Sequence, residues 1–176
     1  ADAARSEHWR ARWGGKNMLR VGIAWRGGTL RSRQFARSIP LRNWFPVLRT
    51  PGAAFCSLQY GNVAGEIDEA MRIGGVEVDQ PGAASEDLDE LAAIVAALDL
   101  VITVDNTVAH LAGALGCPVW TLLPAAPEWR YPRNGARMLW YSSMRLFHRS
   151  HDEDAAAIMG RVASGLAQRI ENRTSA

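Results

Sequence analysis

The sequence predicts an α/β fold: a Rossmann-like, doubly wound and mostly parallel sheet. Three observations support this fold class. Short runs of apolar and β-branched residues alternate along the chain with amphipathic helical segments. Several of these runs are apolar at nearly every position, as in strands that are buried on both faces. Polar residues or glycines follow the ends of the runs. With 176 residues, of which 48% are hydrophobic, the chain is long enough for one full domain and short for two.

The first third of the chain contains two predicted strands. Residues 1–18 are polar and rich in arginine, and we expect a linker or the tail of an upstream region there. The first buried strand is expected at 19–25, and a long polar loop follows it at 27–41. A short helix starts within 42–49, and the second strand covers 53–60.

The remaining elements alternate in the same way. A glycine pair ends the next helix, and acidic residues fill the first turn of the one after it. In order, we expect a helix at 63–75, a short edge strand at 76–79, a helix at 85–99 with Ser85 as N-cap, strands at 100–104 and 118–123, and a last helix at 152–170.

The charge is distributed unevenly behind a formal net charge of +2. Residues 8–65 contain ten Arg or Lys and no acid, whereas 66–99 contain ten acids and one base, Arg72. A basic region beside an acidic one suggests a site for an anion. The basic residues are spread over strand, loop and helix, and no nucleic-acid motif is present, so we expect no nucleic-acid partner.

Cysteine usage and hydropathy bear on the compartment. Cys56 and Cys117 both lie in apolar surroundings, which is typical of buried free thiols in a reducing compartment. No apolar run reaches transmembrane length, and no signal peptide is recognisable. We therefore expect a cytoplasmic protein with no integral membrane segment.

The segment 99–124, DLVITVDNTVAHLAGALGCPVWTLLP, places polar groups where a buried strand ends. Asp105 lies just past that strand, Arg26 and Gly27 follow the first strand, and Tyr60 closes the second. Doubly wound sheets bind ligands beyond the carboxyl ends of their strands, where the strand order reverses. We expect these residues to face one crevice.

A helix that begins near Asn106 adds a partly positive N-terminus and unpaired backbone N–H groups. Asn106 and Thr107 offer short polar side chains that suit a phosphate, and His110 lies about one turn further on the same side. Helix capping alone is an alternative explanation for Asp105 and Asn106. A hydrogen-bonded, half-buried histidine is the alternative for His110.

This segment resembles the signature of the heptosyltransferase-like glycosyltransferases, family 9, especially the forms fused to tetratricopeptide repeats. Family members read close to D-L-V-I-[ST]-V-D-[ST]-x-x-A-H-L-A-G-A-L-G-x-P-V-W. Further segments within residues 19–161 also resemble the family and occur in the order found in its members: VGIAWRGG, ARSIPL, SLQYG, PEWRYP and WYSSMRLFHR.

The resemblance implies the C-terminal half of a GT-B fold, in which two Rossmann-like domains face a cleft. Residues 19–176 would form the nucleotide-sugar-binding domain, and a missing N-terminal domain would supply the catalytic base. The implied partners are an ADP- or UDP-sugar donor and an acceptor glycan or protein. We expect no catalytic residue in this chain.

The resemblance also assigns residues to the donor pocket. By its motif matches these are Arg37 for the donor phosphate, Gln59 and Tyr60 near the nucleotide, and Asp105, Asn106, Thr107 and His110 around the turn. The chain departs from the family at Asn106, where Thr or Ser is usual, and at Arg26, where a small residue is frequent. Arg26 would add charge beside the phosphates, which either helps binding or blocks the pocket.

The tryptophans divide into two pairs. Trp25 and Trp120 lie in predicted strands and are expected in the core. Trp129 and Trp140 follow the last of these strands; Trp129 is a candidate for stacking on a base or a sugar, with packing of the crossover segment as the alternative.

No metal or other cofactor is expected. The Asp-x-Asp string at Asp87 and Asp89 falls in the first turn of a helix, where acids are common. His148 and His151 resemble a solvated loop rather than a metal pair. The motifs G-x-S-x-G, H-E-x-x-H, C-x-x-C and G-x-G-x-x-G are absent from the sequence.

The sequence thus predicts the donor-binding domain of a metal-independent glycosyltransferase, inactive without its N-terminal domain. The main alternative is a non-catalytic module that binds a nucleotide or a phosphorylated ligand. A nucleotide-sugar epimerase, which shares the GT-B architecture, is a weaker alternative because the motif order follows family 9.

Overall fold

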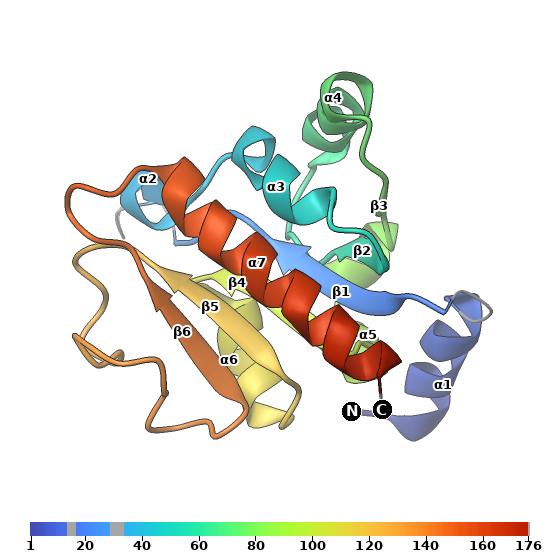
Figure 1. Ribbon diagram of the computed structural model, residues 1–176. Coiled ribbons are helices and arrows are strands. Elements are labelled where there is room, and N and C mark those ends of the chain that lie inside the picture. The colour runs from blue at the N-terminus through green and yellow to red at the C-terminus, as the bar shows by residue number, and fades with distance from the viewer. Residues whose placement is uncertain (14–16, 29–33, 176) are drawn as a thin grey trace.

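Six parallel strands form a single sheet in the order β3-β2-β1-β4-β5-β6 (Figure 1). The computed structural model describes residues 1–13, 17–28 and 34–175, without the side chains of residues 83 and 85. The strands are β1 (Leu19–Ala24), β2 (Ala53–Ser57), β3 (Val78–Asp79), β4 (Leu100–Val104), β5 (Val119–Leu123) and β6 (Met144–His148). The predicted Rossmann-like α/β fold is confirmed, and the point where the strand order reverses lies between β1 and β4.

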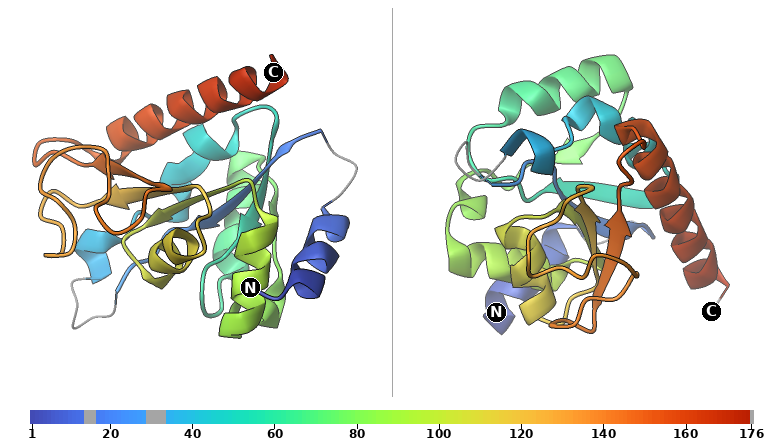
Figure 2. Two further views of the ribbon diagram at one scale, coloured as in Figure 1. Left: turned by 90° about the horizontal axis from the view of Figure 1, so that it is seen from below. Right: turned by 90° about the vertical axis from the view of Figure 1, so that its left-hand side faces the viewer.

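Helices cover both faces of the sheet, as its apolar strands require. One face carries α4 (Ala64–Gly74), α7 (Ala155–Thr174) and the consecutive short helices η2 (Leu41–Trp44) and α3 (Phe45–Leu48). The other carries α1 (Ala3–Arg12), α5 (Leu88–Ala97) and α6 (Thr107–Ala114). The left view of Figure 2 shows α7 above the sheet and α1, α5 and α6 below it. Two shorter helices, α2 (Gln34–Arg37) and η3 (Gly82–Ser85), lie in the connections.

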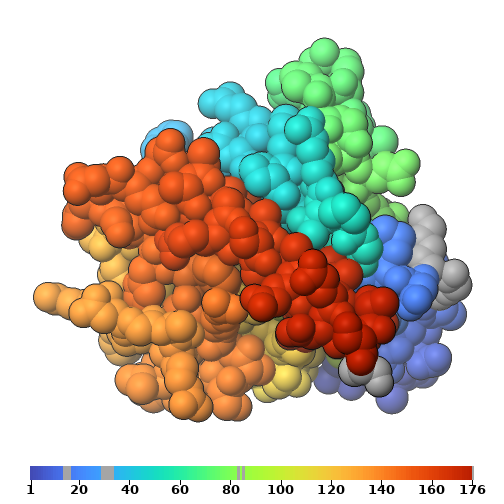
Figure 3. Space-filling model, viewed as in Figure 1, coloured from blue at the N-terminus to red at the C-terminus, as the bar shows by residue number. Residues whose placement is uncertain are grey.

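The core consists of two apolar layers, one on each face of the sheet. Successive strand residues alternate between them: Leu100, Ile102 and Val104 of β4 join the layer under α7, whereas Val101 joins the layer over α5. Trp25 and Trp120 are buried in the layer under α7, as expected for core tryptophans. In the space-filling view, α7 and the segment between β5 and β6 form much of the surface on the α7 side (Figure 3).

Most predicted elements are present with adjusted ends. The second strand ends at Ser57, so residues 58–60 already belong to the loop at the carboxyl edge. Helix α4 ends as predicted, with Gly75 in the left-handed conformation at φ 62°. Helix α5 begins later than expected, because its cap is Asp87 rather than Ser85; the Asp87 side chain accepts a hydrogen bond from the backbone of Glu90.

Strand β6 and helix α1 were not anticipated from the sequence. Helix α1 lies within residues 1–18, where we expected a linker or a tail, and it packs against α5. Trp9 is its buried anchor, and the indole Nε1 donates to a Glu90 carboxylate oxygen at 2.6 Å. Helical periodicity did not reveal α1 because its apolar contacts come from tryptophans set among several arginines.

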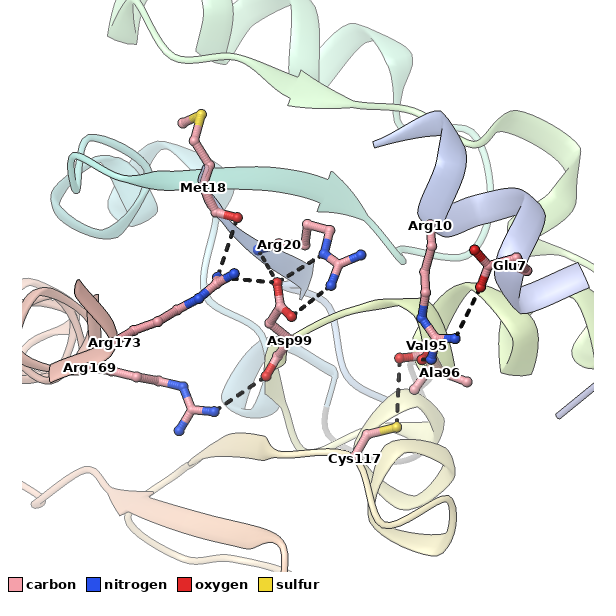
Figure 4. A network of polar contacts seen from close by, with 10 residues as sticks. All are labelled: Glu7, Arg10, Met18, Arg20, Val95, Ala96, Asp99, Cys117, Arg169 and Arg173. Atoms are coloured by element: carbon pink, nitrogen blue, oxygen red, sulfur yellow. Dashed lines mark hydrogen bonds and ion pairs between the residues drawn. The ribbon is translucent and has the colours of Figure 1, made fainter. Parts of the chain in front are cut away.

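Asp99 joins three parts of the chain at the amino ends of the strands (Figure 4). Its carboxylate accepts hydrogen bonds from the backbone, Nε and Nη2 of Arg20, at 2.8, 2.9 and 2.8 Å, and Arg173 of α7 lies 3.6 Å away. Burial by itself would raise the pKa of Asp99, but the Arg20 hydrogen bonds and the charges of Arg20 and Arg173 outweigh it and hold that pKa below its usual value. This network holds the C-terminal end of α7 against the amino ends of the strands, opposite the edge where the crevice is predicted.

Candidate functional site

A pocket of about 640 Å³ lies at the carboxyl edge of the sheet, beyond the ends of β1 and β4. This is the predicted crevice. Of the ten predicted site residues, eight line the pocket: Arg26, Arg37, Gln59, Tyr60, Asp105, Asn106, Thr107 and His110. The other lining residues are Gly28, Gln34, Leu58, Gly61, Val108 and Arg130.

A second pocket, of about 660 Å³, opens at the opposite end of β2 and β3. Its lining mixes apolar residues, Phe55, Val76 and Val78 among them, with charged ones, and Arg12 is paired with Asp79 at 2.9 Å. The polar groups that the sequence analysis singled out converge at the carboxyl edge, where doubly wound sheets bind ligands, and we therefore treat that pocket as the candidate site.

Asn106 caps α6 and ties it to the end of β1. Its Oδ1 accepts hydrogen bonds from the backbone of Ala109 at 3.2 Å and from the Thr103 hydroxyl at 3.0 Å, and its Nδ2 donates to the Arg26 carbonyl at 3.1 Å. The capping alternative is therefore observed for this residue. Asn106 mainly holds the pocket wall together. Thr107 and Val108, the first residues of α6, line the pocket, and the first N–H groups of a helix have no acceptor within the helix.

Gln59 has a similar role on the β2 side. It is buried, and its Oε1 accepts from the backbone N–H groups of Trp25 and Arg26 at 2.9 and 2.8 Å. Tyr60, the next residue, is 70% exposed and stands at the mouth of the pocket. Only Tyr60 of this pair presents a large free surface to a ligand.

Gly27 is needed for a close approach of backbone segments beside the pocket, just beyond the ends of β1 and β4. A Cβ atom at this position would lie 2.5 Å from the carbonyl oxygen of Asp105 and 3.0 Å from that of Arg37. Both contacts are with backbone atoms, which cannot swing aside. Gly27 is thus a packing requirement of the site rather than a lining residue.

Arg37 lies between two carboxylates. Its side chain is only 11% exposed; Nε lies 3.1 Å from Oδ2 of the fully buried Asp105, and Nη1 lies 3.3 Å from Oε1 of Glu128. Its Nη2 also donates to the Asp105 carbonyl at 2.9 Å. The residue expected to contact donor phosphate is present at the pocket, but its charge is balanced in this state.

Arg26 is also ion-paired. Its guanidinium pairs with Glu66 at the start of α4, and the Nε1 of Trp25 donates to the same carboxylate at 2.8 Å. The added charge that distinguishes this chain from the family pattern is therefore largely matched by a neighbouring acid. Arg26 forms part of the pocket wall without carrying an unmatched charge into it.

His110 is half-buried among charged and aromatic groups. Its Nε2 lies 3.3 Å from the Tyr131 hydroxyl, and the ring of Tyr141 packs edge-on at 5.9 Å. Burial is the main cause that lowers the pKa of His110; the positive charges of Arg130 and Arg37 act in the same direction, and Asp105 opposes them. These effects together favour the uncharged imidazole.

Three functional candidates in the segment after β5 escaped the sequence analysis: Glu128, Arg130 and Tyr131. The PEWRYP motif pointed instead to Trp129, which is 81% exposed and is not a lining residue of the pocket. Arg130 lines the pocket, with its guanidinium carbon 5.6 Å from the Trp129 ring centre and its Nε buried without a partner among the described residues. The sequence did contain a signal for Glu128 and Arg130, because these charged residues flank Trp129 shortly after a predicted strand end.

Within residues 1–13, 17–28 and 34–175, no cluster of three or more His, Cys, Asp or Glu side chains is arranged to hold a metal ion. Asp87 and Asp89 belong to the cap and first turn of α5, as the sequence analysis argued. His148 contacts the carbonyl of Gly135 at 2.9 Å. In the same part of the chain, no helix combines the length and the apolar character needed to cross a bilayer.

The family comparison matches a central part of the chain, less than half of its length. Residues 79–156 match the model of glycosyltransferase family 9 (heptosyltransferase). This region contains Asp105, Asn106, Thr107 and His110, together with the segment 124–143. The fusion to tetratricopeptide repeats stays a prediction.

A curated protein matches nearly the whole chain. The chain is 38% identical over 169 residues to Protein FlbA of Caulobacter vibrioides, covering 94% of this chain and 28% of that protein. The chain thus spans little more than a quarter of the curated relative that it matches.

The solved structures show the fold. The Escherichia coli ADP-heptose lps heptosyltransferase II superposes with a TM-score of 0.67 at 15% identity, over 99% of this chain and 53% of that one. A glycosyl transferase family 9 protein from Veillonella parvula DSM 2008 superposes with a TM-score of 0.65 at 10% identity, over 97% and 52%. This chain therefore has the fold of about half of each neighbour.

Proposed function

We propose that this chain is the donor-binding domain of a metal-independent glycosyltransferase, and that the pocket at the carboxyl edge binds the diphosphate of a nucleotide sugar. The observation that carries the proposal is the position of the pocket. It lies between the ends of β1 and β4, where the strand order reverses, with the N-terminus of α6 and Arg130 on its walls. The match of residues 79–156 to glycosyltransferase family 9 supports the same function.

The diphosphate would be held by cations and backbone dipoles. Arg130 brings a guanidinium that pairs with no acid among the described residues. The first N–H groups of α6, from Thr107 and Val108, point beyond the helix end and add a partial positive charge. Arg37 becomes a further phosphate ligand if the phosphate displaces Glu128, the more exposed of its two carboxylate partners at 31% against 1% for Asp105.

These same groups suit the chemistry of sugar transfer. An acceptor hydroxyl oxygen forms a bond to the anomeric carbon, the bond from that carbon to the diphosphate breaks, and the diphosphate leaves with the electron pair. Positive groups already in place around the leaving phosphate stabilise the negative charge that develops on it. No metal is required for this role.

The proton of the acceptor hydroxyl goes to a base, which we assign to a domain outside this chain. Each superposed solved structure is about twice as long as the part that matches, leaving room for such a domain. In this arrangement the chain is the C-terminal half of a GT-B enzyme. Tyr60, at the mouth of the pocket, is placed to stack on the nucleotide base, and Trp129 is left to contact the sugar, the acceptor or the second domain.

A thermal-shift screen of the chain against ADP, UDP, GDP, ADP-heptose and UDP-GlcNAc tests the proposal. A ligand present at about 100 times its Kd stabilises the folded state by about 2.7 kcal/mol, or about 5–10 °C for a chain of this size. Arg130→Ala and Arg37→Ala should remove the shift. Arg133→Ala, which removes an exposed arginine from the same segment outside the pocket, is the matched control and should keep it.

The outcomes are distinct. A shift with one nucleotide that both pocket variants lose and the control keeps supports the proposal and identifies the base. A shift that survives in both pocket variants places the binding site elsewhere. If the full-length protein binds the donor but transfers no sugar to any glycan or protein acceptor, the chain is a non-catalytic nucleotide-binding module instead.

A further inference from the structure

A third cavity, of about 590 Å³, is lined by the C-terminal half of α7 and by residues near the amino ends of β1, β5 and β6. We call it the α7 cavity. The described residues that line it include three arginines and two amides but no acid: Arg145, Arg169, Arg173, Gln168 and Asn172. An open cavity with this lining has a positive potential and several hydrogen-bond donors.

Helix α7 contributes four of these polar side chains from one face. Gln168 and Asn172 are four residues apart, as are Arg169 and Arg173, so the two pairs lie side by side along the helix. The one acid of α7, Glu171, is not among the residues that line the cavity. The helix therefore presents cations and amides, without a carboxylate, to the α7 cavity.

Arg145 forms the opposite wall. It is the register partner of Trp120 on the neighbouring strand, and its guanidinium carbon lies 5.5 Å from the Trp120 ring centre and 4.8 Å from that of Phe147. The aromatic rings hold the cation in place by cation–π attraction. No acid pairs with Arg145 among the described residues, so its charge is uncompensated.

The nearest carboxylate, that of Asp99, is already used by Arg20, from which it accepts three hydrogen bonds. Arg173 lies 3.6 Å from the same carboxylate (Figure 4). Arg169 reaches only the carbonyl of Asp99, at 3.4 Å, and its Nε is buried without a hydrogen-bond partner in the described structure. Since a guanidinium carries five N–H donors, most of the donor capacity of Arg169 is unused.

Stabilisation of the helix end does not account for all three arginines. Basic side chains near a helix C-terminus interact favourably with the partial negative charge there, and this explains Arg173 in the last turn of α7. Arg145 belongs to β6, and this effect gives no reason for its position. Like charges around one cavity repel each other, and an anion between them would replace that repulsion with attraction.

We propose that the α7 cavity is a second anion-binding site, which takes the phosphate group of a small phosphorylated molecule, with Arg145 and Arg169 as its main ligands. Guanidinium groups match phosphate oxygens in bidentate geometry. A phosphomonoester carries a charge of about −1.5 to −2 at pH 7, which suits several guanidinium groups better than a single carboxylate does. The arginines converge on one cavity instead of forming a strip along the surface, and this favours a small molecule over a nucleic acid.

The α7 cavity and the pocket at the carboxyl edge are separate sites. Leu19 lines the first and Arg26 lines the second, at opposite ends of β1. At about 3.3 Å per residue the two positions are about 20 Å apart, too far for one diphosphate to reach both. The proposal therefore does not depend on the proposed function.

Calorimetry with inorganic phosphate and pyrophosphate tests the site in the Arg130→Ala chain, in which the carboxyl-edge pocket lacks its unpaired arginine. We expect pyrophosphate to bind there, and Arg145→Gln added to that chain to weaken binding about tenfold or more, the size of a lost hydrogen bond to a charged group. Arg137→Gln is the matched control. Arg137 is exposed, is bridged through its backbone to Arg145 and does not line the α7 cavity, so its removal should leave the affinity unchanged.

Three results would overturn the proposal. The first is the absence of pyrophosphate binding to the Arg130→Ala chain at millimolar concentration. The second is equal affinity with and without Arg145→Gln. The third is an equal loss in Arg137→Gln, which would show that net charge and not the cavity governs binding. Failure of the wild-type chain to bind any nucleoside diphosphate would count against the proposed function alone.

A second measurement needs no arginine variant. Trp120 lines the α7 cavity, and its indole N–H signal in the NMR spectrum can be assigned by its loss in Trp120→Phe. We expect this signal to move during a pyrophosphate titration of the wild-type chain, with the same Kd as calorimetry gives for the Arg130→Ala chain. If pyrophosphate binds while the Trp120 signal stays in place, the anion lies elsewhere and the proposal is wrong.

Discussion

The buried ion pair between Asp105 and Arg37 makes a quantitative prediction for Asp105→Asn. The Asp105 side chain is 1% exposed and that of Arg37 is 11% exposed. Removing one partner of a buried pair costs about 3–5 kcal/mol, because the other charge is left without its partner. Arg37 keeps Glu128 at 3.3 Å and the Asp105 carbonyl at 2.9 Å, so we place the loss at the lower end, about 3 kcal/mol.

The variant can be measured by thermal and urea denaturation. For a chain of this length, about 3 kcal/mol corresponds to a fall in Tm of about 6–12 °C. With a urea m-value of about 2 kcal/mol/M, the midpoint should fall by about 1.5 M. Asparagine has nearly the same shape as aspartate, so the change reports the loss of charge and not a cavity.

Asp99→Asn is the control for this measurement. Asp99 is also paired with an arginine, Arg20, but the two side chains are 22% and 26% exposed. Solvent screening reduces the value of such a pair, and we expect about 1 kcal/mol, or a fall in Tm of about 2–4 °C. If Asp105→Asn lowers Tm by no more than Asp99→Asn does, burial of the pair at the pocket has no special energetic weight and the reasoning is refuted.

Three further predictions concern the pocket and the Asp99 network. Glu128→Gln frees one side of Arg37 for phosphate, and calorimetry should show nucleoside diphosphate binding about two- to tenfold tighter; weaker binding would mean that the glutamate is itself a ligand contact. Gly27→Ala places a Cβ atom 2.5 Å from the Asp105 carbonyl, so Tm should fall and nucleotide binding should be lost, and a variant with wild-type Tm would contradict the close approach. Because the folded state lowers the pKa of Asp99, its stabilising contribution is complete above the unfolded pKa of about 4 and is lost as pH falls through the folded value. The Tm difference between the wild type and Asp99→Asn should therefore be constant above about pH 5 and shrink below about pH 4; a difference independent of pH would rule out the charge as its source.

The local pattern of the sequence was sufficient for the sheet and for the floor of the pocket. Apolar runs predicted five of the six strands. Asp105, Asn106 and His110 could be identified because the end of a strand and the cap of the next helix are adjacent in the sequence. Gly27 was predicted as a site residue and does lie beside the pocket. The structure explains the glycine by the close approach of two backbone segments rather than by contact with a ligand. Strand β6 was missed because its residues were read as part of a motif.

The charge state of the pocket was decided by contacts between distant residues. Arg37 meets Glu128, 91 positions away, and α1 is anchored through Trp9 and Glu90, 81 positions apart. No sequence periodicity predicts such pairs, because the two residues meet only through the tertiary fold.

In the irregular segment after β5, even the orientation of neighbouring side chains could not be predicted from the sequence. In a helix or a strand, spacing fixes which side chains share a face, and the sequence alone determines the layers of this fold. In a loop no such period exists, so the sequence could not decide that Tyr131 turns inward to His110 while Trp129 turns out to solvent. The tertiary path of the backbone made that choice, and with it the set of groups that a ligand would meet.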